Sequence, residues 1–286
     1  MFPESKTLVA CSVAISLFTI AACSTGDDTV NGPETESSSV QSNEVHGEQG
    51  LAYADDLEND LDILEPQDGD KIYYSLDRRA LDSDVAIAIL NDDGSAYYSN
   101  GAYDEFPALS LIKLLLGYWV VENTTGYEED VAYMLEYSDD ASADSFDGMY
   151  PEAISEVITQ FDLDDTAYNG YWGNATTTAA DLVSFLSQVF VQDPSNPIIT
   201  AMAEVAPVAR DGYHQDFGTA ELNGVLGTKF GWSDDLSAHA SLSYGSGFII
   251  AALGYTTPTE LTQVVEDSLV ATSTSGHTCK GNVCVP

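Results

Sequence analysis

The sequence predicts an α+β domain, an α/β sandwich in which an antiparallel sheet is flanked by N- and C-terminal helices and carries an inserted helical lobe. Three observations support this fold class. Strand-like apolar runs bounded by turn residues stand towards both ends of the domain, helix patterns fill its middle, and a capped helix pattern closes it. Strands that enclose a helical middle are typical of a sheet with helices packed on it.

Residues 1–22 have the pattern of a lipoprotein signal peptide. Leu8–Ala22 is an apolar segment of about 15 residues after Lys6, too short for a helix that spans a bilayer. It ends in Ile-Ala-Ala before Cys23, which resembles a bacterial lipobox. We therefore expect a lipid on Cys23 and an extracytoplasmic protein anchored to the bacterial cell membrane. An ordinary secretory signal with a chance cysteine is the alternative.

Residues 23–69 are rich in Ser, Thr, Asp, Glu, Asn and Gln and contain few aromatic residues. Such a segment cannot bury enough apolar surface to order itself, so we expect a disordered acidic tether. Within it, Leu51–Leu64 is weakly apolar and could dock as a short helix. We place the folded domain at residues 70–272 and a C-terminal tail at residues 273–286.

The composition is strongly acidic, with 47 Asp and Glu against 8 Lys and Arg and a net charge of −39. Phosphate groups are repelled by such a surface, which excludes nucleic acid as a partner. It also disfavours adsorption on anionic lipid, so contact with the membrane is expected through the lipid anchor only. The charge is typical of a solvated, exported surface, and we expect a monomer.

The four cysteines divide into two groups. Cys11 lies within the signal segment and Cys23 at the lipidation position, which leaves Cys279 and Cys284. Two cysteines five positions apart in an exported chain indicate a local disulfide in the tail. A metal site with His277 is the competing interpretation, but three ligands without a fourth are few, so we expect no metal and no cofactor.

The first expected elements are a hairpin and a buried helix. Val85–Leu90 is an apolar run, a turn cluster follows it, and Ala96–Ser99 returns as a strand. Ser110–Val121 then predicts a helix that is apolar nearly all round and therefore buried. Ser110 and Lys113 share one face of this helix, because positions i and i+3 are neighbours.

The later elements follow from caps and periodicity. Thr176–Thr178 directly precedes the helix pattern at Ala179–Phe190 and suits an N-cap. Thr-Pro-Thr-Glu from Thr257 opens the last helix pattern. The expected helices are Glu128–Tyr137, Pro151–Phe161, Ala179–Phe190 and Thr257–Leu269, and the expected strands are Gly224–Phe230 and a stretch from Ala240 to Leu253 that ends in a buried apolar run.

Three short motifs occur in a fixed order along these elements. Ser110-x-x-Lys113 follows Phe-Pro-Ala, Ser138-Asp139-Asp140 comes after the next helix, and Lys229-Phe230-Gly231 lies on a late strand. This set resembles the motifs of the penicillin-binding protein and serine β-lactamase superfamily, class A β-lactamases in particular. The resemblance covers roughly residues 84–272 and implies a β-lactamase/transpeptidase-like fold.

The resemblance implies roles for the motif residues. Ser110 would be the nucleophile, Lys113 its base, and Ser138 the relay of a proton to the leaving group. Lys229 would attract a substrate carboxylate. Asp140 and Gly231 would contact substrate, and the backbone N–H groups of Ser110 and Trp232 would form an oxyanion hole. The expected substrate is a cell-wall peptide or amide, or a β-lactam-like small molecule.

The chain departs from the family pattern at three places. Asp140 stands where the family usually has Asn, and Phe230 where it has Thr or Ser. The loop Tyr168–Asn174 contains no carboxylate at the place of the deacylating Glu of class A enzymes, which argues against efficient β-lactam hydrolysis. The stretch from Ser110 to Ser138 is also short, so we expect a reduced helical lobe.

Other interpretations of the same residues stay open at this point. Lys113 could form a buried ion pair with Asp140 that has no chemical role. Trp172 and its neighbouring tyrosines could be loop packing or, less favoured, a platform for a sugar. The domain is therefore expected to be a serine hydrolase, and a catalytically inactive module that binds or supports the cell envelope is the alternative.

Overall fold

The computed structural model describes residues 70–77, 84–276, 278–280 and 283–285. The predictions for the signal peptide, the lipidated Cys23 and the tether concern residues 1–69 and lie outside this part of the chain. The same is true of the weakly apolar segment Leu51–Leu64, expected as a short docked helix. The predictions that the described residues do test are those for the sheet, the helical lobe and the C-terminal helix.

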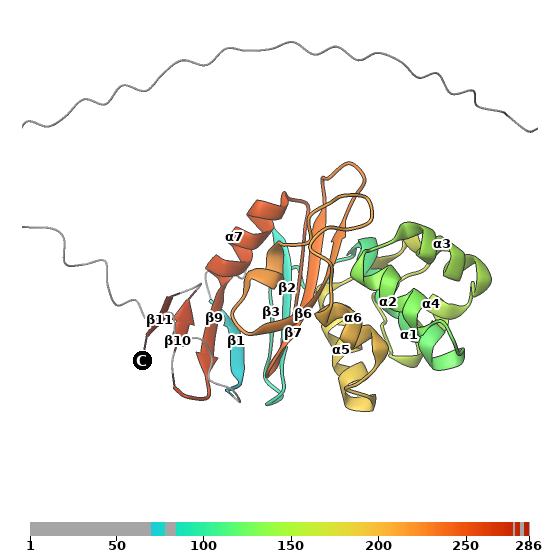
Figure 1. Ribbon diagram of the computed structural model, residues 1–286. Helices are drawn as coiled ribbons and strands as arrows, with labels where there is room; N and C mark the ends of the chain where they lie inside the picture. The colour runs from blue at the N-terminus through green and yellow to red at the C-terminus, as the bar shows by residue number, and fades with distance from the viewer. Residues whose placement is uncertain (1–69, 78–83, 277, 281–282, 286) are drawn as a thin grey trace, which may run out of the picture. The chain divides into compact units, whose positions relative to one another are not determined.

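A five-stranded antiparallel sheet forms the centre of the fold (Figure 1). Its order is β3 (Ala96–Tyr98), β2 (Val85–Asn91), β8 (Phe248–Gly254), β7 (His239–Gly245) and β6 (Val225–Trp232). The predicted hairpin at residues 85–99 is confirmed by the pairing of β2 with β3. The stretch from Ala240 to Leu253 is two strands rather than one, because the chain turns at Gly247, whose φ is +109°.

A second sheet has the order β1 (Ile72–Leu76), β9 (Leu269–Ser273), β10 (Thr278–Lys280) and β11 (Val283–Val285). The C-terminal tail thus continues the domain as a hairpin. The backbone register of that hairpin places Cys279 opposite Cys284. Their side chains lie outside the description, so the disulfide stays a prediction.

Seven α-helices are described, and in Figure 1 all of them except α7 lie on one side of the central sheet. They are α1 (Lys113–Asn123), α2 (Glu128–Glu136), α3 (Asp140–Met149), α4 (Ala153–Gln160), α5 (Ala179–Gln192), α6 (Pro197–Ala203) and α7 (Pro258–Ser268). None of the described helices has the length and apolar character that crossing a membrane requires. The expected α+β fold with an inserted helical lobe is confirmed.

Two of these helices were not predicted from the sequence. The α3 segment is rich in Asp, Ser and Gly, which are poor helix formers, and it begins because the Asp139 side chain accepts a hydrogen bond from the backbone N–H of Ser142. The α6 helix has seven residues, with Asn196 as its cap and Pro197 at its start. Both are specified by their caps more than by an apolar period.

The sheet separates two apolar cores. Along β8, Ile250 and Ala252 face one core, while Ala251 and Leu253 face the other, as the period of two in a strand requires. The first core packs against α7 and β1, and the second against the helical lobe. Helix α1 lies within the lobe core and is buried from Lys113 to Val120, as its apolar sequence predicts.

Helix α7 is fixed by a capping box at its first turn. The Thr257 hydroxyl accepts a hydrogen bond from the backbone N–H of Glu260, and the Glu260 carboxylate accepts one from the backbone N–H of Thr257. From this start the helix directs Leu261 and Val265, both fully buried, onto the sheet. The cap therefore holds one face of the core in place.

Replacing Thr257 with Ala removes this cap. We expect Thr257→Ala to lower the free energy of unfolding by about 1 kcal/mol, because an N-cap oxygen of this kind satisfies an otherwise unpaired helix N–H. Chemical denaturation measures the change. Thr259→Ala, an exposed position in the same turn, is the matched control and should lose little or nothing. Equal losses in the two variants would contradict the importance of the cap.

Candidate active site

The predicted nucleophile lies in a tight turn at the start of α1. The strand β4 (Phe106–Pro107) pairs with β5 (Thr176–Thr177), and a 3-10 helix follows at Leu109–Ile112. The expected helix at Ser110–Val121 therefore begins as a 3-10 turn, and its α-helical part starts at Lys113. Leu109 has a φ of +52°, a conformation that costs energy for a residue with a side chain and is common at functional turns.

Ser110 is 8% exposed, yet its hydroxyl has no hydrogen-bond partner among the described residues. In particular, Lys113 Nζ does not hydrogen-bond to it. Among the described residues, the one buried side-chain atom without a hydrogen-bond partner is Gln215 Oε1, so the Ser110 hydroxyl is accessible to solvent rather than orphaned in the interior.

Lys113 is fully buried and its ammonium has three partners. Nζ donates to the Ser138 carbonyl oxygen at 2.8 Å and to Asp140 Oδ1 at 2.5 Å, and it lies 4.6 Å from the centre of the Trp172 ring. Burial lowers the pKa of Lys113, while Asp140 raises it, and burial prevails. The ion pair considered as an alternative in the sequence is therefore present, but Asp140 has a side chain that is 65% exposed.

Ser138 connects the two motif lysines. Its φ of +51° turns the chain sharply between α2 and α3, so that its carbonyl oxygen faces Lys113 while its hydroxyl faces the sheet. There Lys229 Nζ donates to Ser138 Oγ at 2.8 Å. One residue thus accepts a hydrogen bond from each of two buried ammonium groups, through two different oxygens.

Lys229 enters this arrangement from β6, the edge strand of the central sheet. It is fully buried, and its second hydrogen bond is to the backbone oxygen of Phe230 at 3.3 Å. Burial and repulsion by Lys113 lower the pKa of Lys229 well below its usual value. The Lys229 ammonium is buried and bonded to Ser138, so the predicted contact with a substrate carboxylate is not seen and stays a prediction.

Gly231 lets β6 approach the nucleophile turn closely. A Cβ at this position would lie 2.8 Å from Leu109 Cβ and 3.1 Å from the backbone nitrogen of Ser110. Any larger residue would force the strand and the turn apart. The backbone amide of Ser110 therefore lies beside Gly231, the residue before Trp232, and the oxyanion hole itself stays a prediction.

Phe230, one of the departures from the family pattern, faces away from the site. It is 1% exposed and packs edge-on against Phe217 at 5.0 Å in the core beneath α7. Neighbouring residues of a strand alternate between its two sides, so Lys229 and Phe230 point in opposite directions. Phe230 therefore contributes to core packing, and the hydroxyl that the family pattern usually has at this position is missing.

The loop that carries Trp172 is fastened to α3. The Trp172 indole N–H donates to Asp144 at 2.7 Å, and its backbone N–H donates to Asp147 at 3.0 Å. Tyr168 donates to the other oxygen of Asp147 at 2.7 Å. Trp172 is only 7% exposed, which supports the loop-packing interpretation over an open sugar platform. Its ring nevertheless covers the Lys113 ammonium, a cation–π contact that the sequence did not indicate.

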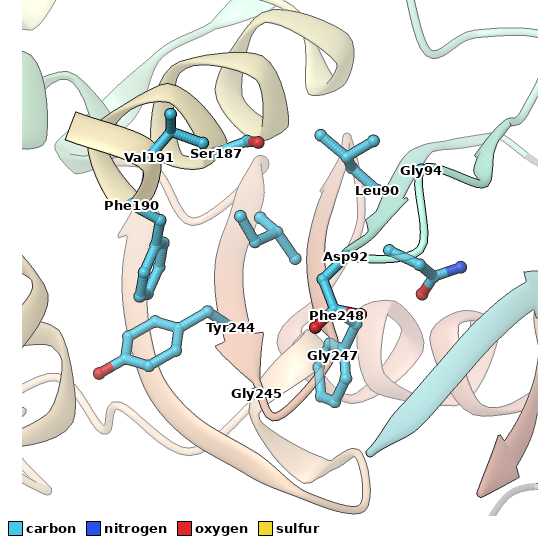
Figure 2. A pocket seen from close by; sticks show the side chains of 12 residues that line it. Leu90, Asp92, Gly94, Ser187, Phe190, Val191, Tyr244, Gly245, Gly247 and Phe248 are labelled. Atoms are coloured by element: carbon cyan, nitrogen blue, oxygen red, sulfur yellow. The ribbon is translucent and has the colours of Figure 1, made fainter. Parts of the chain in front are cut away.

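A separate hollow of about 450 Å³ lies between α5 and the turns that end β2 and β7 (Figure 2). Figure 2 shows the Phe190 and Tyr244 rings on one side of it and Leu90 on the other. Gly245, on its wall, pairs with Val225 at the start of β6, whereas the motif residues lie towards the end of that strand. None of the motif residues lines this hollow, so it is distinct from the site around Ser110.

The three motifs that the sequence singled out thus meet in space. The structure brings Ser110, Lys113, Ser138 and Lys229 together from four separate elements, with Asp140 and Gly231 beside them. Among the described residues, no group of three or more His, Cys, Asp or Glu could hold a metal ion.

Comparison with known proteins supports the fold and nothing finer. No protein-family model and no curated protein matches the sequence. Solved structures do match: a β-lactamase from Chitinophaga pinensis DSM 2588 has a TM-score of 0.53 and 14% identity, and the match covers 65% of this chain and 92% of that one. A β-lactamase from Sphaerobacter thermophilus DSM 20745 gives 0.51 and 14%, over 66% and 96% of the two chains.

A third match, the β-lactamase from Streptomyces albus G, has a TM-score of 0.50 and 12% identity and covers 63% of this chain and 89% of that one. The resemblance predicted from the motifs is therefore confirmed for the fold, which is β-lactamase-like. At these identities the comparison does not extend to activity, and the chemistry has to be argued from the residues themselves.

The buried lysine at position 113 gives a direct test of the site. We expect Lys113→Met to raise the free energy of unfolding at neutral pH by about 1 kcal/mol, since a functional group that is costly to bury is removed and the exposed Asp140 stays hydrated. Denaturant titration of the two proteins measures this. A variant of equal or lower stability would instead show that the Lys113–Asp140 pair is structural.

The gain should depend on pH in a defined direction. Because the folded pKa of Lys113 is lowered, the unfolded chain binds this proton more tightly and the wild type gains stability as pH rises towards 10.5, the ordinary lysine value. The advantage of Lys113→Met is therefore largest below the folded pKa and shrinks across the window up to 10.5. A constant difference over that range would contradict the lowered pKa.

Proposed function

We propose that this domain, which has a β-lactamase-like fold, is a serine acyl-transfer enzyme with Ser110 as its nucleophile. The observation that carries the proposal is the position of Ser138 between Lys113 and Lys229, each 2.8 Å from one of its oxygens. Two buried ammonium groups around one serine are costly to fold, and such costs are typical of catalytic sites. Ser110 lies in the 3-10 turn that leads directly into Lys113.

The proposed reaction begins with attack of Ser110 Oγ on the carbonyl carbon of an amide, ester or β-lactam. A bond forms between Oγ and that carbon, and the bond from the carbon to the leaving nitrogen or oxygen breaks. The proton of Ser110 passes to a base and from there, through the Ser138 hydroxyl, to the leaving group. Water or another acceptor then cleaves the acyl ester and restores Ser110.

Lys113 is the candidate for the base. Its lowered pKa favours the neutral amine that a base requires, and it is the motif lysine on the same turn of chain as Ser110. Its ammonium is directed to Asp140 and Ser138. Action as a base therefore requires that the Lys113–Asp140 contact is given up, which the exposed position of Asp140 permits.

The tetrahedral intermediate would be stabilised by the backbone N–H groups of Ser110 and Trp232. Removing one such donor from an enzyme typically costs a factor of about 10² to 10³ in rate. The substrate class we propose is a peptide or amide of the cell wall or a β-lactam-like molecule. Since the loop Tyr168–Asn174 supplies Trp172 and no carboxylate next to Lys113, we propose slow release of the acyl group.

A second candidate is a catalytically inactive binding or structural module of the cell envelope. The Lys113–Asp140 ion pair and the burial of Phe230 favour it, because both remove groups that the proposed chemistry would use. Under either proposal the protein is exported and attached to the membrane through Cys23.

Covalent labelling separates the two candidates. We expect a fluorophosphonate or a labelled penicillin to add one adduct to the full chain, as seen by intact mass, and Ser110→Ala to abolish it. Lys113→Met should slow labelling by about 10²-fold or more, the usual contribution of a general base. Ser155→Ala, an exposed serine on α4, is the matched control and should label like the wild type. Absence of any adduct with reactive acyl donors would favour the inactive module.

The lipid anchor is tested separately. We expect Cys23→Ser, expressed with the native leader in a bacterial host, to move the protein from the membrane fraction to the soluble fraction, because the thioether-linked lipid is lost. Cell fractionation with immunoblotting measures the shift. Unchanged membrane association would show that the lipobox assignment is wrong.

A further inference from the structure

A second group of side chains lies directly beside the proposed oxyanion hole and was not indicated by the sequence motifs. A hollow of about 310 Å³ opens at the end of β6, next to Trp232. Two aromatic rings and two carboxylates are among its walls, from Asp211, Tyr213, Trp232 and Asp234, together with Leu236. We call this the end-of-β6 pocket.

The aromatic wall of the end-of-β6 pocket is held rigidly. The rings of Tyr213 and Trp232 are stacked, with centroids 4.8 Å apart and an interplanar angle of 24°. The Tyr213 hydroxyl contacts His239 Nε2 at 2.7 Å, and His239 Nδ1 contacts the Thr256 carbonyl oxygen at 2.7 Å. Since that oxygen can only accept, Nδ1 carries a proton. Burial lowers the pKa of His239, which favours the neutral ring with Nε2 accepting from Tyr213.

The carboxylate wall is equally well positioned. Asp211 accepts hydrogen bonds from the backbone N–H of Tyr213 at 2.8 Å and from the Trp232 indole N–H at 3.0 Å. These use only part of its accepting capacity, because a carboxylate has about four acceptor sites. The turn that carries Asp234 is fixed by Asp235, whose three hydrogen bonds from Ser233 and Ser237 lower its pKa to about 2.

The pocket belongs to the same site as Ser110. The segment that carries Asp211 runs alongside the end of α2, where Arg210 N–H donates to the Tyr137 carbonyl oxygen at 2.7 Å, immediately before Ser138. The charge of Asp211 raises the pKa of Lys113, so the two groups are close enough to interact. On the other side, Trp232 follows Gly231, which touches the nucleophile turn.

The charges around this site select against an anionic ligand. Lys229 is fully buried and already bonded to Ser138, and Lys113 is paired with Asp140. Arg210 is exposed and is not part of the pocket wall. A substrate carboxylate entering the end-of-β6 pocket would meet the carboxylates of the exposed residues Asp211 and Asp234, whereas an ammonium group would meet opposite charges beside the Tyr213–Trp232 stack.

We propose that the end-of-β6 pocket is a subsite for an alkylammonium group, and that the substrate is an acyl donor that carries such a group. The assignment as a subsite of a reaction rests on the proposed function, whereas ammonium binding itself does not. A primary amine on a short alkyl chain fits the chemistry of the walls: the chain contacts Leu236 and the rings, and the nitrogen faces Asp211 or Asp234.

Binding is tested without any catalytic step. In the Ser110→Ala protein, butylammonium should shift the NMR signal of the Trp232 indole N–H, assigned with Trp232→Phe, and should bind about tenfold more tightly than 1-butanol, while butyrate should not bind. Asp211→Asn should reduce ammonium binding to the level of butanol. Glu129→Gln, an exposed carboxylate on α2, is the charge-matched control and should bind like the parent protein. Equal binding of the three molecules overturns the proposal.

Reactivity is tested in the wild type with a matched series of 4-nitrophenyl esters, those of 6-aminohexanoate, hexanoate and monoadipate. We expect kcat/KM to fall in that order by about tenfold a step, mostly through KM, and Asp211→Asn to flatten the series. If no ester reacts while butylammonium still shifts the indole signal, the acyl-transfer proposal fails and the ammonium pocket stands. If the esters react at equal rates, the specificity proposal fails and the enzyme proposal stands.

Discussion

Two ammonium groups are buried within reach of one serine, and much of the local structure follows from the need to accommodate them. An isolated charge taken out of water is very unfavourable unless it finds hydrogen-bond partners or gives up its proton. Here both compensations operate. Ser138 supplies an oxygen to each lysine, and burial lowers the pKa of both. The positive φ of Ser138 is what allows its two oxygens to face in different directions.

Leu109 and Gly231 serve the same arrangement, whereas Asp162, which also has a positive φ, lies just after α4. Leu109, at positive φ, presents the unpaired hydroxyl of Ser110 at the foot of α1, and Gly231 removes the side chain that would keep β6 away from it. Strained residues persist only where the surrounding structure fixes them. Here β4, α1 and the edge of the central sheet do so, and two of the four described non-glycine residues at positive φ, Leu109 and Ser138, lie where the proposed chemistry takes place.

The sequence predicted the parts of this structure that depend on local signals. Thr257 and Thr178 predicted the starts of α7 and α5, because each is an N-cap with a defined partner. The apolar run of α1 predicted that this helix is buried. The order of the motifs predicted which side chains meet. Helix α3 was missed because its residues are poor helix formers, and Asp139, which caps it, was read only as part of a motif.

The contacts that the sequence could not predict are those between segments distant in the chain. Nothing near Trp172 indicates that its ring covers Lys113, and Asp211 and Tyr213 lie in a loop with no motif. Asp211 and Tyr213 lie near the site only because residues 206–215 run past the end of α2. Sequence motifs identify the candidate reacting residues. The residues proposed to select the substrate, such as Asp211 and Tyr213, lie on a connecting loop that carries no motif.

The acidic composition acquires a more specific meaning in this setting. A net charge of −39 by itself favours charged lysines everywhere in the chain, yet the pKa values of Lys113 and Lys229 are lowered, because desolvation acts at contact distance and surface charges are screened by water and salt. Asp140 and Asp211 are exposed, but they lie near enough to Lys113 to raise its pKa against the effect of burial. In the proposed ammonium subsite, carboxylates from the same acidic excess would favour a cationic substrate over an anionic one.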